Sequence, residues 1–235
     1  MQKPTCVIVT GAAGNLGRAT AARLAGQGVN LVCVDRTAEV LDALVRSLPS
    51  GTKALIFAGA DLGDPAVAQA MVEAAVDCFG GIDALVNTVG GFATGPVASD
   101  ALAQWDLMMA LNARVALVTS IAVLPVMQAA RYGRIVHIAA APGLKAGANQ
   151  AAYAASKAAV LRLTESIALE HRSNRITANC ILPGTIDTPQ NRAAMPDAKV
   201  SDWVAPDSIA RLIAFLISPE AAVVTGAAIP ATGLE

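Results

Sequence analysis

The feature that most constrains the fold is a regular alternation between short apolar runs and longer segments with helical spacing. The predicted strands are Cys6–Thr10, Asn30–Val34, Lys53–Phe57, Ala84–Asn87, Arg134–Ile138, Thr177–Leu182 and Ala227–Pro230. The predicted helices are Leu16–Gln27, Ala38–Ser47, Pro65–Phe79, Leu102–Ala130, Ala151–His171 and Ser208–Ser218. Strands that are apolar throughout are buried on both faces, which requires a parallel sheet covered by helices. We therefore predict an α/β fold, with one domain over residues 1–235 and a doubly wound parallel sheet of about seven strands.

The composition supports a compact chain and argues against two classes of partner. Apolar residues make up 54% of the chain and charged residues 15%, which is typical of a well-buried core. The 17 basic and 18 acidic residues are interspersed and give a net charge of −1. Because nucleic acids and anionic membrane surfaces attract basic patches, we expect neither of them as a partner.

We expect neither a membrane span nor a targeting segment. The longest apolar stretch, Val115–Met127, contains Pro125 and two hydroxyl residues, and it is shorter than the ~18–20 residues that a span needs. The N-terminal "MQKPTCVIVTG" runs directly into the first predicted strand, without the apolar region of a signal peptide. Four cysteines without a CxxC pair predict a cytoplasmic protein with reduced thiols and no metal site. The final Leu234–Glu235 resembles a remnant of an expression vector.

A glycine-rich turn follows the first predicted strand. In "VIVTGAAGNLGRAT", Gly11, Gly14 and Gly17 lie at the head of a predicted helix, together with Asn15 and Leu16. Glycines let the backbone turn tightly and approach a phosphate, and the free N–H groups of a helix N-terminus bind the pyrophosphate of a dinucleotide. Such a turn alone also occurs at ordinary strand–helix connections, so the prediction of a dinucleotide site depends on the residues that accompany it.

Polar residues at the ends of the next strands extend the predicted cofactor site. Asp35 ends the second strand, where a carboxylate accepts hydrogen bonds from the adenosine ribose and repels a 2′-phosphate. This favours NAD(H), although the neighbouring Arg36 leaves NADP(H) open. For an aspartate alone at a strand end, a helix cap or a solvated turn is the competing interpretation. The other candidates at this edge of the sheet are Asp61, Leu62, Asn87 and Gly90.

Tyr153 and Lys157 are four residues apart in a predicted helix and therefore share one face. A phenol has a reference pKa near ~10, so proton transfer at neutral pH is helped by a nearby positive charge. The pair is thus a candidate proton donor accompanied by a lysine that lowers the pKa of the phenol. Taken alone, this spacing is also common for two surface residues.

Together, these motifs resemble the short-chain dehydrogenase/reductase family. "TGAAGNLG", "NTVGG", "WDLMMALNA", "YAASK" and "NCILPGTIDTP" occur in the order and at the distances of that family, over nearly the whole chain. The resemblance implies a Rossmann fold, a small-molecule substrate and hydride transfer with a nicotinamide dinucleotide. It also implies that Tyr153 is the proton donor, that Lys157 binds the nicotinamide ribose, and that Asn112 holds a relay water. The residues implied to line the nicotinamide carboxamide are Pro183, Gly184, Ile186 and Thr188.

Two departures from the family pattern bear on the substrate. The middle glycine, Gly14, lies one position before its usual place, which Asn15 occupies. The serine that binds the substrate oxygen in the family is replaced by Ala140, with alanines on either side. Loss of one such preorganised donor typically costs ~10²–10³ in rate, so a plain ketone substrate is disfavoured.

The same departures are similar to those of one branch of the family, the dihydropteridine reductases. That branch also resembles this chain in "GGF", which includes Phe92, and in "LPGTIDTPQNRAAMPDAKVSDW". The resemblance implies an NADH-dependent reductase of a quinonoid dihydropterin, whose conjugated C=N system tolerates the missing hydroxyl. Asn112 fits the general family better than it fits this branch.

The segment 189–205 is the predicted substrate lid, and a loop packed at a subunit interface is the competing interpretation. The candidate substrate contacts are Ala140, Phe92, Arg192, Met195 and Trp203. The resemblance further implies a homodimer or homotetramer that pairs the long helices Leu102–Ala130 and Ala151–His171.

Three functions stay open on the sequence alone. The first is a dihydropteridine-reductase-like enzyme, and the second is a general carbonyl reductase or alcohol dehydrogenase that acts on 3-oxoacyl or polyol substrates. The third is a dinucleotide-binding sensor without turnover. The retained Tyr153 and Lys157 argue against the sensor, because binding alone does not need the phenol.

Overall fold

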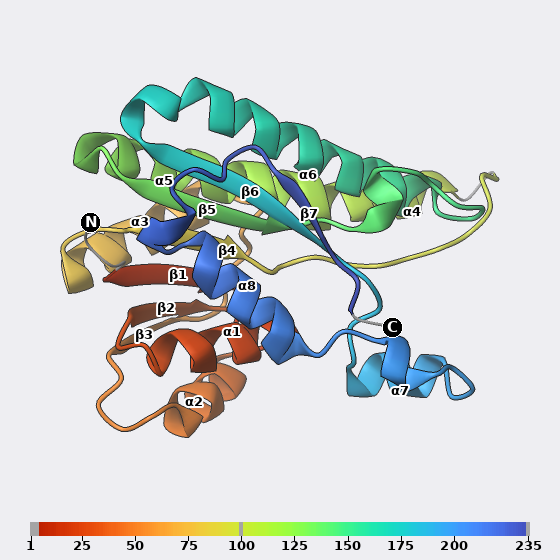
Figure 1. The fold of residues 1–235 in the computed structure, drawn as a ribbon, viewed down its shortest axis with the longest axis horizontal. Coiled ribbons are helices and arrows are strands. Elements are labelled where there is room, and N and C mark those ends of the chain that lie inside the picture. The colour runs from red at the N-terminus through yellow and green to blue at the C-terminus, as the bar shows by residue number, and fades with distance from the viewer. Residues whose placement is uncertain (1–4, 99–100, 234–235) are drawn as a thin grey trace.

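A computed structural model describes residues 5–98 and 101–233, so the suspected vector remnant lies outside the described residues. Seven parallel strands form one sheet in the order β3-β2-β1-β4-β5-β6-β7 (Figure 1). The strands are β1 (Cys6–Thr10), β2 (Asn30–Val34), β3 (Ala54–Phe57), β4 (Ala84–Asn87), β5 (Gly133–Ile138), β6 (Ile176–Pro183) and β7 (Ala228–Ala231). The predicted doubly wound parallel sheet is confirmed, with strand ends shifted by at most one residue. The chain order reverses between β1 and β4, which is where open α/β sheets bind ligands.

Helices cover both faces of the sheet (Figure 1). They are α1 (Asn15–Ala25), α2 (Ala38–Ser47), α3 (Pro65–Phe79), α4 (Ala101–Met108), α5 (Val115–Ala130), α6 (Ala151–Glu170), α7 (Pro189–Ala194) and α8 (Pro206–Leu216). Helices α1, α2 and α8 pack on one face, and α3, α5 and α6 pack on the other. The short α7 lies in the predicted lid, where the sequence analysis gave no helix.

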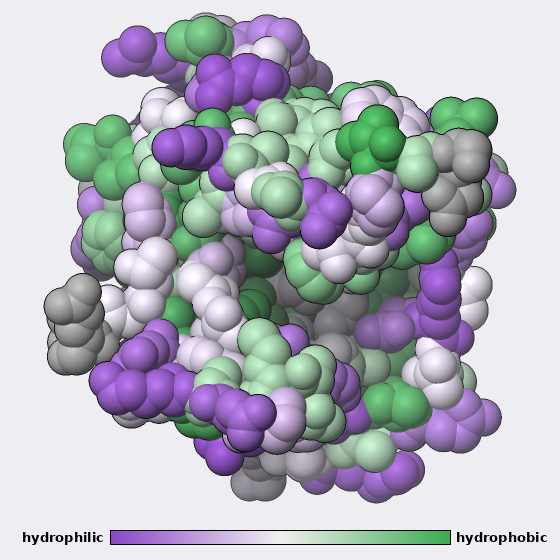
Figure 2. All heavy atoms as spheres, turned by 90° about the vertical axis from the view of Figure 1, so that its right-hand side faces the viewer, coloured by the Kyte–Doolittle hydropathy of each residue, from purple (hydrophilic) through white to green (hydrophobic). Residues whose placement is uncertain are grey.

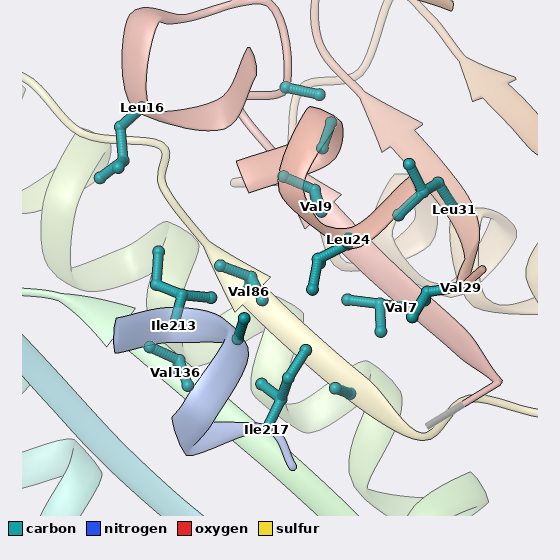
Figure 3. Close-up of a cluster of buried hydrophobic side chains, with 14 of the residues drawn as sticks. Val7, Val9, Leu16, Leu24, Val29, Leu31, Val86, Val136, Ile213 and Ile217 are labelled. Carbon is teal, nitrogen blue, oxygen red and sulfur yellow. The ribbon is translucent and has the colours of Figure 1, made fainter. Parts of the chain in front are cut away.

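Alternate residues of each strand feed two separate cores. Val7 and Val9 of β1 face α1 and α8, whereas Cys6 and Ile8 face the other layer. Figure 3 shows the first core, where Leu24 of α1 and Ile213 of α8 meet the sheet. Each fully buried side chain of this size contributes ~1.5–3 kcal/mol to folding. Because both faces are covered, most strand positions are apolar, and the exceptions include the buried Asn87, Arg134 and Thr177.

The predicted helix Leu102–Ala130 is interrupted by a π-helical turn, η1 (Met109–Arg114), between α4 and α5. The wider turn accommodates an extra residue, and such turns are frequent at functional sites. Asn112 lies in this turn and is buried. A simple helical period in the sequence gives no sign of it.

The continuous helical stretch Ala101–Ala130 also changes one expectation. Its most apolar 18-residue window has a mean hydropathy of 1.9, so by length and composition this stretch is able to cross a membrane. The length argument made from Val115–Met127 was therefore wrong. Half of that window is buried inside the protein, as in the core helix of a globular domain.

Candidate active site

The glycine-rich turn joins β1 to α1 at the carboxyl end of the sheet. Gly11 has a positive φ of 67°, which a residue with a side chain rarely adopts. A Cβ on Gly17 would lie 2.1 Å from the carbonyl oxygen of Gly11, so only glycine fits there. The N–H of Gly14 donates to the same oxygen at 3.0 Å. Leu16, which the sequence analysis placed at the cofactor, instead packs its side chain into the core.

Asp35 links this turn to the end of β2. One of its carboxylate oxygens accepts a hydrogen bond from the N–H of Ala13 at 2.9 Å, and the other accepts from the N–H of Arg36 at 2.7 Å. The carboxylate therefore fixes the position of the turn in addition to any contact with a ribose. Asp35 is partly buried, and it is not a helix cap, because Thr37 is the residue that precedes α2.

A cleft of about 340 Å³ opens between the glycine turn and the ends of β2, β3 and β4. Its lining includes Gly11, Gly14, Asp35, Arg36, Asp61, Leu62 and Gly90. Figure 2 looks onto this end of the molecule and shows that it is hollowed. The residues fit a dinucleotide, because a glycine cradle and a helix N-terminus face one carboxylate across the cleft.

Two other residues of the predicted site, Asn87 and Asn15, have structural roles away from the cleft lining, whereas Asp61 lines the cleft. Asn87 is buried, with its side chain bonded to Thr10 and Thr119, so it ties β4 to β1 and α5 and does not line the cleft. Asn15 donates from Nδ2 to Gln190 at 2.9 Å, which connects the glycine turn to the predicted lid. Asp61 lines the cleft, and Asp64 is the residue that caps α3.

Tyr153 and Lys157 share one face of α6, as predicted. The Lys157 ammonium is buried and donates to the carbonyl oxygen of Ile138 at 2.9 Å, at the end of β5. It lies 5.9 Å from the centre of the Tyr153 ring. A Cβ on Gly90 would lie 3.1 Å from the Lys157 Nζ atom, so this lysine reaches the wall of the cofactor cleft.

Burial moves the pKa values of both groups away from their ordinary values. Desolvation raises the pKa of Tyr153 to about 12 and lowers the pKa of Lys157 to about 8. At neutral pH, the phenol therefore keeps its proton and the lysine remains mostly charged. The sequence analysis expected Lys157 to lower the pKa of Tyr153, but in this structure desolvation acts on the phenol and raises its pKa.

Asn112 joins α6 to the loop after β4. Its Nδ2 atom donates to the Gly91 carbonyl at 3.1 Å and to the Ser156 hydroxyl at 3.0 Å, while Oδ1 accepts from the Gly91 N–H at 3.0 Å. Both hydrogens of the amide are thus used within the protein. Ser156, which the sequence analysis missed, in turn donates to the Tyr153 carbonyl at 2.8 Å. Its place in "YAASK" was the available signal.

The side chains that lie next to Tyr153, on the side where the substrate is predicted to bind, are apolar. Phe92 packs edge-on against the Tyr153 ring, with the ring centres 4.8 Å apart, although Phe92 is 65% exposed. Ala140 is buried after the end of β5, between Ala139 and the turn Ala141–Gly143. No hydroxyl is available within this alanine run.

The predicted lid contains α7 and the turn Val200–Asp202. Thr188 caps α7 by accepting from the Asn191 N–H at 3.1 Å, and Ile186 bridges to Val204. Arg192 forms two hydrogen bonds to the Asp187 carboxylate, at 2.6 and 2.8 Å, so its charge is already paired. Met195 is 40% exposed. Pro183 and Gly184 lie at the end of β6, and their contact with the nicotinamide stays a prediction.

Comparisons with known proteins agree with the geometry of this site. The family model described as "short chain dehydrogenase" matches residues 5–199. The chain belongs to the short-chain dehydrogenase family. It is therefore an oxidoreductase of a family that uses NAD(P)(H), as the glycine turn and the Tyr153–Lys157 pair predict.

Individual relatives cover nearly the whole chain. A (2S)-[(R)-hydroxy(phenyl)methyl]succinyl-CoA dehydrogenase subunit of Thauera aromatica is 34% identical over 93% of this chain and 91% of its own. A 3-oxoacyl-[acyl-carrier-protein] reductase of Vibrio cholerae is 32% identical over 96% and 95% of the two chains. The crystal structure of a levodione reductase superposes with a TM-score of 0.91 at 31% identity, covering 97% of this chain and 96% of its own. The names of these relatives specify three different substrates.

Proposed function

We propose that this protein is an NADH-preferring reductase of a small conjugated substrate, with Tyr153 as the proton donor. The observation that carries the proposal is the half-buried Tyr153 phenol, which lies beside the buried Lys157 ammonium next to a glycine-lined cleft. The dinucleotide supplies a hydride when it is bound. The chain's own residues bind it, orient the substrate and deliver a proton.

The roles of the site residues follow from their positions. Asp35 lines the adenosine half of the cleft, where its negative charge favours NADH over a cofactor with a 2′-phosphate. Lys157 holds a positive charge at the wall formed by Gly90. Tyr153 stays protonated at neutral pH because burial raises its pKa to about 12, and a protonated phenol suits the direction of reduction.

The alanine run around Ala140 limits the class of substrate that the site can reduce efficiently. An isolated ketone gains from a hydroxyl donor that stabilises its developing negative charge, and such a donor is worth ~10²–10³ in rate. Ala140 cannot provide it, whereas a conjugated C=N acceptor spreads the charge over its own π-system. A quinonoid dihydropterin is the first candidate of this kind. The exposed Phe92 ring beside Tyr153 offers a surface for a flat substrate.

A second candidate is a general carbonyl reductase or alcohol dehydrogenase. It is favoured by the relatives, because a 3-oxoacyl reductase and a levodione reductase cover nearly the whole chain at 31–32% identity. In this case the substrate oxygen would be held by Tyr153 alone, and turnover of simple ketones would be slow.

The deciding experiment measures NADH oxidation by the purified protein at 340 nm. Quinonoid dihydropterin, a cyclic diketone and a 3-oxoacyl thioester are compared at equal concentrations, with Tyr153→Phe as the matched inactive variant. A kcat/KM for the dihydropterin that is at least tenfold above both carbonyl substrates supports the first candidate. Preference for either carbonyl substrate supports the second, and no turnover with tight NADH binding supports a sensor.

We also propose that the protein assembles as a dimer or tetramer through α4, α5 and α6. Leu107, Leu117 and Ile121 are large apolar side chains that are 44–59% exposed on this stretch. A groove of about 480 Å³ runs between this stretch and α6, lined by Met109, Leu117 and Leu163 among others. An exposed apolar face of this kind is characteristic of a subunit interface. Light scattering of wild type and Leu117→Arg tests the proposal, because the variant should shift to a smaller assembly.

A further inference from the structure

The end of the sheet opposite to the cofactor cleft holds a second, larger cavity. It has a volume of about 790 Å³ and lies at the amino ends of β4, β5 and β6, the end of the sheet at which β1 also begins (Figure 1). Four arginines line it, together with one aspartate, one tyrosine and two threonines. The residues of the lining that matter below are Arg131, Arg134, Arg172, Arg175, Tyr132 and Thr177.

The buried wall of this cavity carries polar atoms without partners. Arg134 is 3% exposed and Thr177 is 6% exposed, and the two are register neighbours on β5 and β6. Within the described residues, the Arg134 Nε, Thr177 Oγ1 and Tyr132 Oη atoms are buried without a hydrogen-bond partner. Buried donors of this kind are rare in native proteins, and each calls for an explanation such as a bound ion. Three of them along one cavity indicate a ligand that accepts hydrogen bonds.

The charge of the cavity favours an anion. The Arg134 Nη1 atom donates to the Gly133 and Arg175 carbonyls, and Arg131 donates to the Ser173 carbonyl. The Arg134 guanidinium also lies over the Tyr132 ring, 4.4 Å from its centre, so these contacts are all with neutral groups. The ion pairs found among residues 5–98 and 101–233 include none of the four arginines. Of the acidic groups nearby, Asp83 already accepts three hydrogen bonds from Thr5 and Cys6, and Glu220 lies near Tyr132.

We propose that this cavity binds a small phosphate-bearing anion. Arginine guanidinium groups match phosphate oxygens in geometry and charge, and threonine and tyrosine hydroxyls donate to the same oxygens. The exposed Arg131, Arg172 and Arg175 attract the anion at the mouth, while Arg134 and Thr177 hold it at the wall. The volume exceeds what a bare phosphate needs, and Ile176 and Val223 give an apolar wall for an organic part.

Two of the arginines offer a test that does not depend on damaging the fold. Arg131 and Arg175 adopt left-handed backbone conformations, with φ of 50° and 62°, which favour glycine. Arg131→Gly and Arg175→Gly therefore remove a charge from the cavity while relieving the backbone. Thr177→Val removes a buried hydroxyl that has no partner, so this variant should be at least as stable as the wild type when phosphate is absent. Arg211→Ala is the control, since Arg211 is an exposed arginine on α8, paired with Asp207.

The experiment is calorimetric titration of the intact protein with orthophosphate at constant ionic strength, followed by titration with a hexose phosphate. The expected result is saturable binding that weakens at least about tenfold in Arg175→Gly and Arg131→Gly, and also weakens in Thr177→Val, but not in Arg211→Ala. Tighter binding of the hexose phosphate assigns the site to an organic phosphate, and equal binding assigns it to free phosphate.

Either of two results overturns the proposal. The first is the absence of saturable binding of both probes at millimolar concentrations. The second is binding of the same strength in wild type, Arg175→Gly and Thr177→Val, because such binding would belong to the glycine turn at the other end of the sheet. Thermal unfolding with and without phosphate is the parallel readout, and the phosphate-dependent gain in Tm should shrink in the cavity variants only.

Discussion

Gly17→Ala tests how closely the cofactor turn depends on one missing methyl group. An added Cβ would lie 2.1 Å from the Gly11 carbonyl oxygen and 2.7 Å from the Ala12 Cα atom. Both neighbours are backbone atoms, so no side chain can rotate away. Because ordinary contacts of this kind begin near 3.4 Å, the turn must open by more than 1 Å.

The magnitude follows from two opposing effects. Alanine favours a helix over glycine by about 1 kcal/mol, and Gly17 lies in the first turn of α1. Overpacking in a tight site typically costs ~1–3 kcal/mol. The net loss of stability is therefore modest, up to about 2 kcal/mol. The larger effect is on the cofactor, because a displacement of ~1 Å in a positioned site can cost ~10² in rate.

Gly26→Ala is the matched control, at the C-cap of the same helix. Gly26 has ordinary helical angles, with φ of −62° and ψ of −14°, and an added Cβ would meet nothing closer than 3.5 Å. This substitution should stabilise the protein by about 0.4–1 kcal/mol through the unfolded state. NADH binding by fluorescence and unfolding by urea are measured for both variants. The reasoning is refuted if Gly17→Ala binds NADH within twofold of the wild type.

Four further variants test the remaining assignments. Tyr153→Phe should lower kcat by ~10²–10⁴ with NADH affinity unchanged, and full turnover in steady-state assays would remove Tyr153 from the mechanism. Asp35→Ala should reduce the preference for NADH over NADPH by about tenfold or more, since it removes a like charge that faces the 2′-phosphate; an unchanged ratio of kcat/KM values argues against the ribose contact. Ala140→Ser should raise kcat/KM for simple ketones while leaving NADH binding unchanged, and no gain in ketone turnover would contradict the alanine argument. In Lys157→Met, the sign of the pH effect is fixed: the lysine pKa is lowered in the folded state from 10.5 to about 8, so burial of the charge costs stability in full below pH 8, by about 3 kcal/mol. That cost is relieved between pH 8 and 10.5, where the unfolded chain binds more protons than the folded chain. In urea titrations over this range, the free energy of unfolding of the wild type should therefore rise relative to that of Lys157→Met. A constant difference between the two free energies would contradict the pKa shift.

Much of the candidate site could be predicted because parallel strands all deliver their carboxyl ends to one edge. Gly11, Asp35 and Gly90 follow three different strands, and the topology brings them to one cleft. Tyr153 and Lys157 needed only the period of a helix. Leu16 and Asn87 were predicted at the cofactor, but their side chains point into the interior. The direction in which a side chain leaves the backbone depends on local geometry, which the strand order does not fix.

Other features had no local signal in the sequence. The π-helical turn rotates Asn112 into the interior, and Ser156 then joins it to α6. The hydrogen bond between Asn112 and Ser156 connects residues that are far apart in the chain. The pairing of Arg192 with Asp187 likewise removes a charge that the sequence alone presents as available for a substrate.

The sequence by itself determined the fold class, the dinucleotide turn and the Tyr153–Lys157 pair, because these follow from short periods and from residue types with few conformational options. Only the tertiary structure decided how the groups are used. Burial raises the pKa of Tyr153 and keeps the phenol protonated. Hydrogen bonds hold the Asn112 side chain against the loop after β4. The strand register places Arg134 beside Thr177 at the amino end of the sheet. Solvation and long-range register are properties of packed elements, and no stretch of sequence carries them alone.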